Sequence, residues 1–323
     1  MNSQPPQVVV FGAGPWGRNL VRVFGELEAL AAVVEPDAEA RQKLSDLTSA
    51  PTAATFEELP GDIRRVLTAA AVASPAATHE NVGMKMLKLG LDLFVEKPLA
   101  LSLAGAQRLH DQATTNDRIL MVGHLLLFHP AITALKGLID QGELGELRYI
   151  YSNRLNLGRV RKEENILWSF APHDIAVMLH LLDEQPTNVS AQGGSWLHHD
   201  VADVTVTHCD FPSGAKAHVF VSWLHPYKEQ KLVVVGSEKM AVFDDLAADK
   251  KLTLLDSGID LPQGGIPAPR RGEHRPIPHA EDEPLRLELE HFLDCCRNRT
   301  APLTDGPHAL KVMDVLERAQ DSL

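Results

Sequence analysis

The residues with the clearest chemical signal form a glycine-rich turn near the start of the chain. Gly12-Ala13-Gly14-Pro15-Trp16-Gly17 follows the apolar run Val8 to Phe11 and opens a segment with helical spacing. In such a turn the first glycine permits a tight bend, the second lets the backbone approach a pyrophosphate, and the third packs helix against strand. The start of the helix then offers N–H groups to the phosphates. The turn predicts a dinucleotide site, and a purely structural glycine turn is the alternative.

Glu35 stands at the end of the next apolar run, where a dinucleotide site places an acidic side chain. A carboxylate there accepts hydrogen bonds from the adenosine ribose hydroxyls and repels a 2′-phosphate. The residue therefore favours NAD over NADP as the cofactor.

The second chemical signal is Phe94-Val95-Glu96-Lys97-Pro98-Leu99, at the carboxyl end of an expected strand. Ligands of open α/β sheets bind outside these strand ends. Lys97 is thus placed to exchange a proton with a substrate hydroxyl, and burial near a cationic nicotinamide would lower its pKa toward neutrality. From position alone, an exposed lysine that pairs with Glu96 is an equally good interpretation.

The elements that must hold these residues alternate strand and helix through the first third of the chain. Strands are expected at 8–11, 30–34, 66–73, 91–95 and 119–122, and helices at 16–30, 37–47, 78–89 and 103–113. Alternation of this kind predicts right-handed βαβ units and a doubly wound parallel sheet. We assign residues 1–122 to this Rossmann domain.

The pattern changes in residues 123–323, which we assign to an α+β domain for substrate binding and oligomerisation. After a helix at 130–141, period-two alternation at 147–152, 202–211, 215–224 and 231–235 predicts a mostly antiparallel open sheet. Residues 256–284 are rich in proline and predict an irregular loop, and helices near Pro284 and Pro307 close the chain. The last helix could dock back on the first domain.

Composition excludes several classes of function. The chain has 44% hydrophobic and 23% charged residues, an ordinary globular balance that excludes disorder as the main state. With 31 Lys and Arg against 43 Asp and Glu, the net charge of −12 argues against nucleic acid as a partner. No apolar stretch is long enough to span a bilayer, and the three cysteines form neither a disulfide framework nor a zinc-ligand pattern. We expect a reduced, cytoplasmic protein without metal.

Together, several motifs resemble the Gfo/Idh/MocA family of oxidoreductases. They are Gly12 to Gly17, Ala73-Ser74-Pro75 with Thr78-His79, Glu96-Lys97-Pro98, Gly123-His124, and His173 before a helix. The resemblance implies a Rossmann domain followed by a mixed-sheet domain, a tightly bound nicotinamide cofactor, and hydride transfer at a sugar or polyol carbon. It also implies a homodimer or homotetramer assembled through the open sheet.

The resemblance extends to individual site residues. It implies that Ser74, Pro75, His79 and Glu96 join the glycine turn in binding the cofactor, and that Lys97 is the proton donor or acceptor. His173 matches a second acid or base, whereas Ser169 stands where the family motif has Asp, so the full proton relay is in question. His124 is either near the substrate or a hinge histidine. Asp174 beside His173 lacks the companion ligands that a metal site needs.

Arg154, Asn156, Arg159 and Arg161 follow one of the expected strands. The arginines could clamp a phosphate or carboxylate of the substrate, and a solvated loop is the default alternative. This cluster, with the Trp16-Gly17-Arg18-Asn19 segment and the 167–174 run, looks most like the subgroup acting on nucleotide-linked sugars, such as UDP-N-acetylglucosaminuronate.

We therefore predict an NAD-dependent sugar dehydrogenase in which Lys97 takes the hydroxyl proton and His173 orients the hydroxyl or relays the proton. Two alternatives stay open. One is a dehydrogenase of a free sugar or inositol. The other is a non-catalytic NAD-binding sensor or scaffold, which Ser169 favours and the retention of Lys97 with His173 disfavours.

Overall fold

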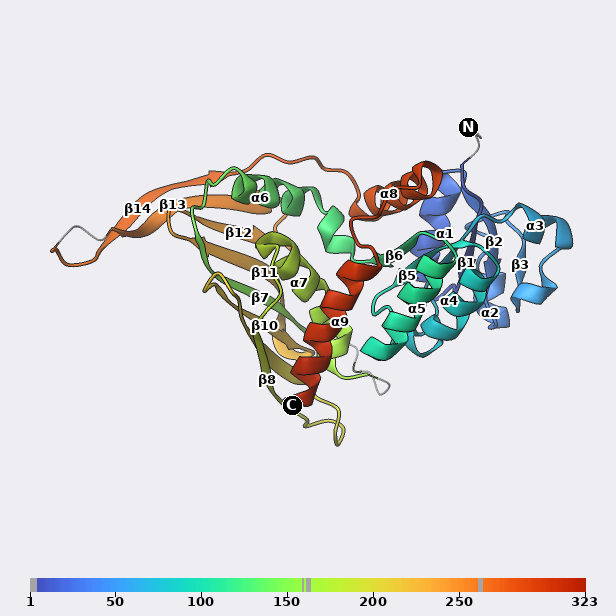
Figure 1. Ribbon diagram of the computed structural model, residues 1–323, viewed down its shortest axis with the longest axis horizontal. Helices are drawn as coiled ribbons and strands as arrows, with labels where there is room; N and C mark the ends of the chain where they lie inside the picture. Colours follow the sequence, from blue (N-terminus) through green and yellow to red (C-terminus); the bar gives the residue numbers. More distant parts are fainter. Residues whose placement is uncertain (1–4, 159, 161–163, 261–263) are drawn as a thin grey trace. The chain divides into compact units, whose positions relative to one another are not determined.

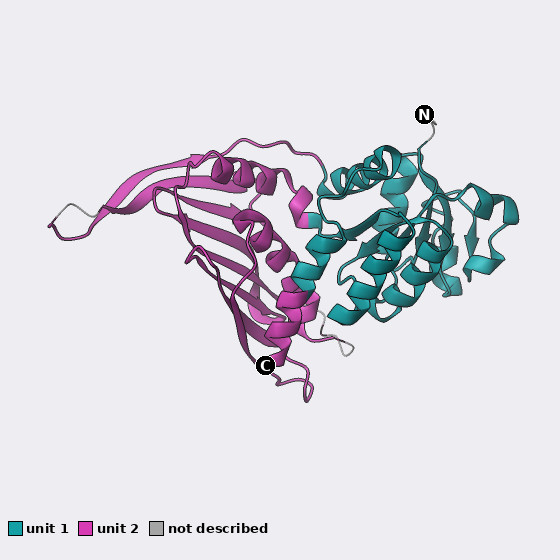
Figure 2. Ribbon diagram, viewed as in Figure 1, with its two compact units in different colours: residues 1–125, 283–313 teal, residues 126–282, 314–323 magenta. Residues whose placement is uncertain are grey.

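The computed structural model describes residues 5–158, 160, 164–260 and 264–323. They divide into two compact units, coloured separately in Figure 2. Unit 1 comprises residues 1–125 and 283–313, and unit 2 comprises residues 126–282 and 314–323. This division differs from the predicted one, because residues 283–313 belong with the first unit and not with the second.

Unit 1 is built on a six-stranded parallel sheet with the order β3-β2-β1-β4-β5-β6 (Figure 1). Its strands are β1 (Val8–Phe11), β2 (Leu30–Val34), β3 (Thr52–Ala53), β4 (Ala69–Val72), β5 (Asp92–Glu96) and β6 (Leu120–Gly123). The strand order reverses between β1 and β4, which is where open α/β sheets bind ligands at their carboxyl ends. The predicted Rossmann fold is confirmed.

The helices of unit 1 cover both faces of this sheet. They include α1 (Gly17–Glu26), α2 (Ala38–Gln42), α3 (Gly61–Val66), α4 (His79–Lys88) and α5 (Leu103–Thr115). Right-handed crossovers that run outward from β1 and β4 place α1 on one face and α4 with α5 on the other. The strand expected to start at residue 66 begins at Ala69, because Val66 ends α3.

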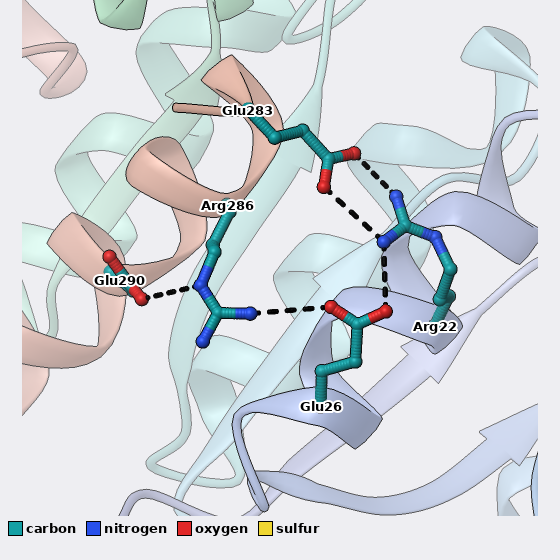
Figure 3. A network of polar contacts seen from close by, with 5 residues as sticks. All are labelled: Arg22, Glu26, Glu283, Arg286 and Glu290. Atoms are coloured by element: carbon teal, nitrogen blue, oxygen red, sulfur yellow. Dashed lines mark hydrogen bonds and ion pairs between the residues drawn. The ribbon is translucent and has the colours of Figure 1, made fainter. Parts of the chain in front are cut away.

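Two late helices return to unit 1, namely α8 (Pro284–Asn298) and the first part of α9 (Gly306–Asp321). Helix α8 contacts α1, and its Phe292 ring meets Phe94 of β5 edge to face at 5.7 Å. Figure 3 shows the ion-pair network that joins the C-terminal half of α1 to the N-terminal end of α8. In it Arg22 binds Glu26 and Glu283, and Arg286 binds Glu26 and Glu290.

Unit 2 contains an eight-stranded mixed sheet with the order β14-β13-β12-β11-β7-β10-β9-β8. The strands are β7 (Leu147–Leu157), β8 (Asn188–Gly194), β9 (Val204–Asp210), β10 (Lys216–Ser222), β11 (Leu224–Gly236), β12 (Met240–Asp244), β13 (Leu252–Asp260) and β14 (Ala268–Pro276). Only the β7–β10 pair is parallel among these described strands. The prediction of a mostly antiparallel open sheet is confirmed.

One face of this sheet is covered by α6 (Pro130–Asp140) and α7 (Ile166–Leu182), as Figure 1 shows. Even-numbered residues of the centre of β7, such as Ser152, point toward α7. The odd-numbered residues occupy the other face, which we call the open face. Its centre carries aromatic and aliphatic side chains, namely Tyr149, Tyr151, His208, His218, Val233 and Val235.

The prediction of an irregular loop over residues 256–284 is wrong at 256–260 and 268–276, which are strands, and holds at 277–283. Strands β13 and β14 pair antiparallel from Thr253 opposite Pro276 to Asp260 opposite Ala268. From residue 256 onward none of its described strand residues is buried, so no apolar alternation marks this part of the hairpin in the sequence. Its proline-containing strand lies at the sheet edge, where a missing N–H is tolerated. Arg270 reinforces the pairing by contacting Asp256 and Asp260.

None of the helices in the described residues combines the length and apolar character needed to cross a bilayer. Within the same part of the chain, no cluster of three or more His, Cys, Asp or Glu side chains could hold a metal ion.

Candidate functional site

The glycine turn has the close backbone packing expected of a dinucleotide site. Gly12 adopts a positive φ of 95°, and a Cβ on it would lie 2.7 Å from the backbone N of Ser74. A Cβ on Gly17 would lie 2.1 Å from the carbonyl O of Gly12. Both positions therefore require glycine, because the first βα turn packs directly against the loop that follows β4.

Gly14 differs from its neighbours because its surroundings are open. A Cβ on it would meet no heavy atom within 4 Å. In the described residues, the N-terminus of α1 has no capping side chain and no acidic residue in its first turn. The backbone N–H groups there are thus left to a phosphate, and the space above Gly14 allows a pyrophosphate to approach. These features fit a dinucleotide cofactor.

Glu35 holds the turn as well as facing the cofactor region. Its carboxylate accepts hydrogen bonds from the backbone N–H of Ala13 at 2.6 Å and of Asp37 at 2.9 Å. The side chain is half-buried at the end of β2. A carboxylate in this position still has acceptor capacity for the hydroxyls of a ribose.

The loop after β4 carries Ser74, Pro75 and His79. The Ser74 hydroxyl lies 2.6 Å from that of Thr78, beside the glycine turn. The His79 ring is buried, and its two nitrogens lie 2.8 Å from the backbone O of Ser74 and of Pro98. His79 therefore ties this loop to the Glu96-Lys97-Pro98 segment.

Glu96 links that segment to the glycine turn. At the end of β5, its carboxylate accepts a hydrogen bond of 2.5 Å from the indole Nε1 of Trp16. Lys97 follows directly and is half-buried. Unit 1 thus brings together the cofactor turn and the predicted acid–base residue, through one hydrogen bond between residues distant in sequence.

His124 lies at the end of β6 and is 2% exposed. Its ring stands edge to face against His308 of α9 at 5.4 Å. Burial, followed by the neighbouring His308 and Lys97, keeps the pKa of His124 well below its usual value. A neutral imidazole therefore adjoins Lys97, which suits a hydrogen-bonding role more than a charged one.

In unit 2, the predicted residues Ser169 and His173 lie on α7. The helix begins at Ile166, where Asn165 accepts a hydrogen bond from the N–H of Trp168, so the expectation that His173 precedes a helix is wrong. Residues four apart share one helix face, which places the Ser169 hydroxyl and the His173 ring side by side. Ser169 is buried and His173 half-buried.

Arg154 proves to be neither a solvated loop residue nor a free anion clamp. It lies on β7, and its guanidinium donates to both carboxylate oxygens of Asp174 at 2.7 and 3.2 Å. The Ser152 hydroxyl also donates to Asp174 at 2.6 Å. The fork geometry that would bind a substrate phosphate is already used inside unit 2. Arg159 and Arg161 lie outside the described residues.

Asn156 also lies on β7, and its Oδ1 is buried without a hydrogen-bond partner among the described residues. Sequence reasoning did not identify three polar residues that the structure places near the candidate ones, namely Asp174 as the partner of Arg154, His308 and Glu288. Each contacts or faces a residue far away in the chain, so no local spacing marks it. The sequence does show the apolar stripe of α8, and the acidic residue Glu288 on that stripe is the one sequence signal that could have marked it.

Comparison with known proteins assigns both parts of the chain. Residues 7–124 match the model of the oxidoreductase family with an NAD-binding Rossmann fold, and residues 132–242 match the Gfo/Idh/MocA C-terminal domain. Together the two matches cover most of the chain.

Two curated relatives act on different substrates. A scyllo-inositol 2-dehydrogenase (NAD(+)) of Bacillus subtilis is 28% identical over 72% of this chain and 68% of its own. A UDP-N-acetylglucosamine 3-dehydrogenase of Acidithiobacillus ferrooxidans is 24% identical over 94% of this chain and 93% of its own.

Solved structures show the same fold. The structure of that dehydrogenase, GnnA, superposes with a TM-score of 0.84 over 98% of this chain and 97% of its own, at 23% identity. GenD2 from gentamicin A biosynthesis, solved with NAD, superposes with a TM-score of 0.83 over 100% of this chain and 95% of its own, at 21% identity.

Proposed function

Because the chain belongs to the Gfo/Idh/MocA family of oxidoreductases and carries its NAD-binding Rossmann domain, we propose that it is an NAD-dependent dehydrogenase of a sugar CH–OH group. The substrate we propose is a nucleotide-linked sugar. The observation that supports this function best is the hydrogen bond from Trp16 to Glu96, because it brings the cofactor turn next to Lys97.

The residues proposed to hold the cofactor all belong to unit 1. The α1 N-terminus and Gly14 receive the pyrophosphate, and Glu35 accepts from the adenosine ribose. Ser74 and Pro75 flank the turn, with His79 behind them. When bound, NAD supplies the hydride acceptor of the reaction.

The proposed acid–base residue is Lys97. In the direction of oxidation, its neutral amine takes the proton of the substrate hydroxyl, and in reduction its ammonium returns it. His124, neutral and beside Lys97, offers a hydrogen-bonding imidazole. His173 is proposed to orient the hydroxyl, with Ser169 giving a further hydrogen bond where the family motif has a carboxylate.

The proposed substrate class rests on the relatives. The UDP-N-acetylglucosamine 3-dehydrogenase aligns over nearly the whole chain, whereas the inositol enzyme aligns over a smaller part. The finding that Arg154 is bound to Asp174 removes one of the sequence arguments for a phosphorylated ligand. A free sugar or inositol is therefore the competing substrate class.

An absorbance assay tests the function. Purified protein with NAD is offered UDP-N-acetylglucosamine, its uronate and scyllo-inositol, and reduced nicotinamide is followed. Reduction by a UDP-sugar supports the proposal, and reduction by inositol alone replaces the substrate class. Bound NAD without turnover on any of them would favour the sensor, with Ser169 as the residue to restore to Asp.

A further inference from the structure

Glu288 of α8 is a buried carboxyl group in an unexpected place. Its side chain is fully buried, at 0% exposure. Neither carboxyl oxygen has a hydrogen-bond partner among the described residues. A charged carboxylate in such surroundings is very costly, so the group is far more stable with a proton bound.

The position of Glu288 is fixed by the packing of α8 on β5. Phe94 and Glu96 are two residues apart on the strand and point to the same side of the sheet. Glu288 and Phe292 are four apart on the helix and share one face. The Phe94 and Phe292 rings are in contact at 5.7 Å, and Glu288 therefore lies opposite Glu96, one helical turn from this contact. The ion pairs between α1 and α8 hold the helix in this register (Figure 3).

Glu96 is itself tightly enclosed. Its carboxylate accepts from Trp16 and lies against Gly123, where an added Cβ would come within 3.0 Å of Oε2. Lys97 is the next residue in the chain. Glu96 therefore has contacts with the cofactor turn, with the end of β6 and, through the backbone, with the proposed acid–base residue.

Burial and the neighbouring charges determine the protonation state of each carboxyl group in this pair. Burial raises the pKa of Glu96 to about 7, against the lowering effects of the Trp16 hydrogen bond and the Lys97 charge. Burial and then the Glu96 charge raise the pKa of Glu288 well above its usual value. His124 follows Gly123 at the end of β6 and has a pKa well below its usual value, and His308 of α9 packs against it.

We propose that Glu288 and Glu96 form a buried acid pair in which Glu288 keeps its proton while Glu96 gains and loses one. Glu288 is then a positioning residue, which sets through Glu96 the charge beside Lys97 and the strength of the Trp16 contact. The inference rests on the proposed function only for its link to Lys97 and the cofactor turn. The pair itself is a property of unit 1.

Infrared spectroscopy tests the protonation of Glu288 without cofactor or substrate. The full chain, labelled with carboxyl-13C glutamate, is measured at about pH 8.5, where an ordinary glutamate is ionised. We expect one C=O band of a protonated glutamic acid in the wild type, its loss in Glu288→Gln, and its retention in the control Glu290→Gln on the exposed side of the same helix. Absence of the band from the wild type would overturn the proposal without any need for a variant.

NADH binding tests the action of Glu288 through Glu96. The fluorescence of bound NADH is titrated from about pH 5.5 to about pH 9, which spans the titration of Glu96. Affinity should fall below a midpoint near pH 7, because a neutral carboxyl is a weaker acceptor for the Trp16 N–H than a carboxylate. Glu96→Gln and Trp16→Phe should abolish this dependence, and His308→Asn should not.

The Glu288 variants separate positioning from packing. Glu288→Gln, neutral and of equal size, should keep the midpoint, whereas Glu288→Leu should raise it by about one pH unit because a polar neighbour of Glu96 is lost. An unmoved midpoint in Glu288→Leu, or one lowered by about a unit or more in Glu288→Gln, would contradict the proposal. Absence of turnover on every sugar would count against the proposed function alone, since these midpoints need no substrate.

Discussion

Lys97 is the residue on which the proposed reaction depends most. It is half-buried at the end of β5, next to the neutral His124 and joined through Glu96 to the cofactor turn. Lys97→Met keeps the aliphatic stem and removes the amine, so turnover should fall by about 10²–10⁴-fold. NADH affinity, measured by fluorescence, should change little. The control Lys88→Met, at the end of α4, should leave both unchanged, and near-native turnover of Lys97→Met would contradict the role.

Glu35 should determine the choice between cofactors. Its carboxylate already holds the N–H of Ala13, and a 2′-phosphate brought beside it would meet a negative charge. Glu35→Ser should therefore weaken NADH binding and narrow its preference over NADPH, both measured by fluorescence titration. Glu39→Gln on α2 is the control. An unchanged NADH-to-NADPH affinity ratio would show that selectivity arises elsewhere.

Candidate site residues could be named where they stand at a strand end, because a strand end is visible as a short apolar run followed by a break. The glycines, Glu35 and Lys97 stand at such ends, although their contacts reach residues far away in the chain. Arg154 is expected as a solvated loop residue or an anion clamp, and neither expectation includes Asp174 because that partner is on another element. Glu288 escapes prediction for the same reason. Pairings across elements depend on packing that no single-sequence spacing encodes.

At the scale of elements, different glycines of the first βα turn serve the fold and cofactor binding. Gly12 is required by the fold, since it has a positive φ and its Cβ would contact Ser74, whereas Gly14 has open space around it. Gly14→Ala should therefore melt within a few degrees of the wild type and yet bind NADH much more weakly, because the methyl group takes the space of the pyrophosphate. Gly12→Ala should lower the melting temperature clearly. Wild-type NADH affinity in Gly14→Ala would exclude this site for the phosphates.

The contact of α7 with β7 should be far stronger than that of α8 with α1. Asp174 and Arg154 form a buried, bidentate ion pair, with side chains only 5% and 12% exposed. Asp174→Asn leaves the Arg154 charge unpaired and should cost about 3–5 kcal/mol of unfolding free energy. Glu283→Gln, in the half-exposed network of Figure 3, should cost under about 1 kcal/mol. Equal losses of unfolding free energy in Asp174→Asn and Glu283→Gln, measured by urea titration, would contradict this ranking.

Elements were predictable to the degree that they are buried. The strands of unit 1 are apolar runs, and Leu30–Val34 was expected with the bounds that the structure has. The β13–β14 hairpin was missed beyond residue 255 because its strand residues there have no buried face, and backbone pairing with the ion pairs of Arg270 holds them. The start of α7 differs from expectation because the family resemblance alone placed a helix after His173, whereas the helix begins at Ile166 and contains Pro172.

At the scale of the molecule, each unit has its own sheet, and among the described residues no helix covers the open face of the unit 2 sheet. The open face carries stacked aromatic rings, with Tyr151 and His218 at 5.4 Å and nearly parallel. Tyr149 donates to the Nδ1 of His218 or accepts from it. A sheet face that carries half-buried aromatic and aliphatic side chains is typical of an association surface. We propose that two copies of the chain pair through it.

Substitution at the centre of the open face tests this assembly. Tyr151→Asp places a carboxylate among Tyr149, His218 and Val233, where a second copy would have to bury it without a partner. We expect a dimer or tetramer in the wild type by analytical ultracentrifugation, and a monomer in the variant. Val66→Asp, an exposed apolar residue of α3 in unit 1, is the control and should keep the wild-type mass. A monomeric wild type, or an unchanged mass in Tyr151→Asp, would mean that the open face is not the interface.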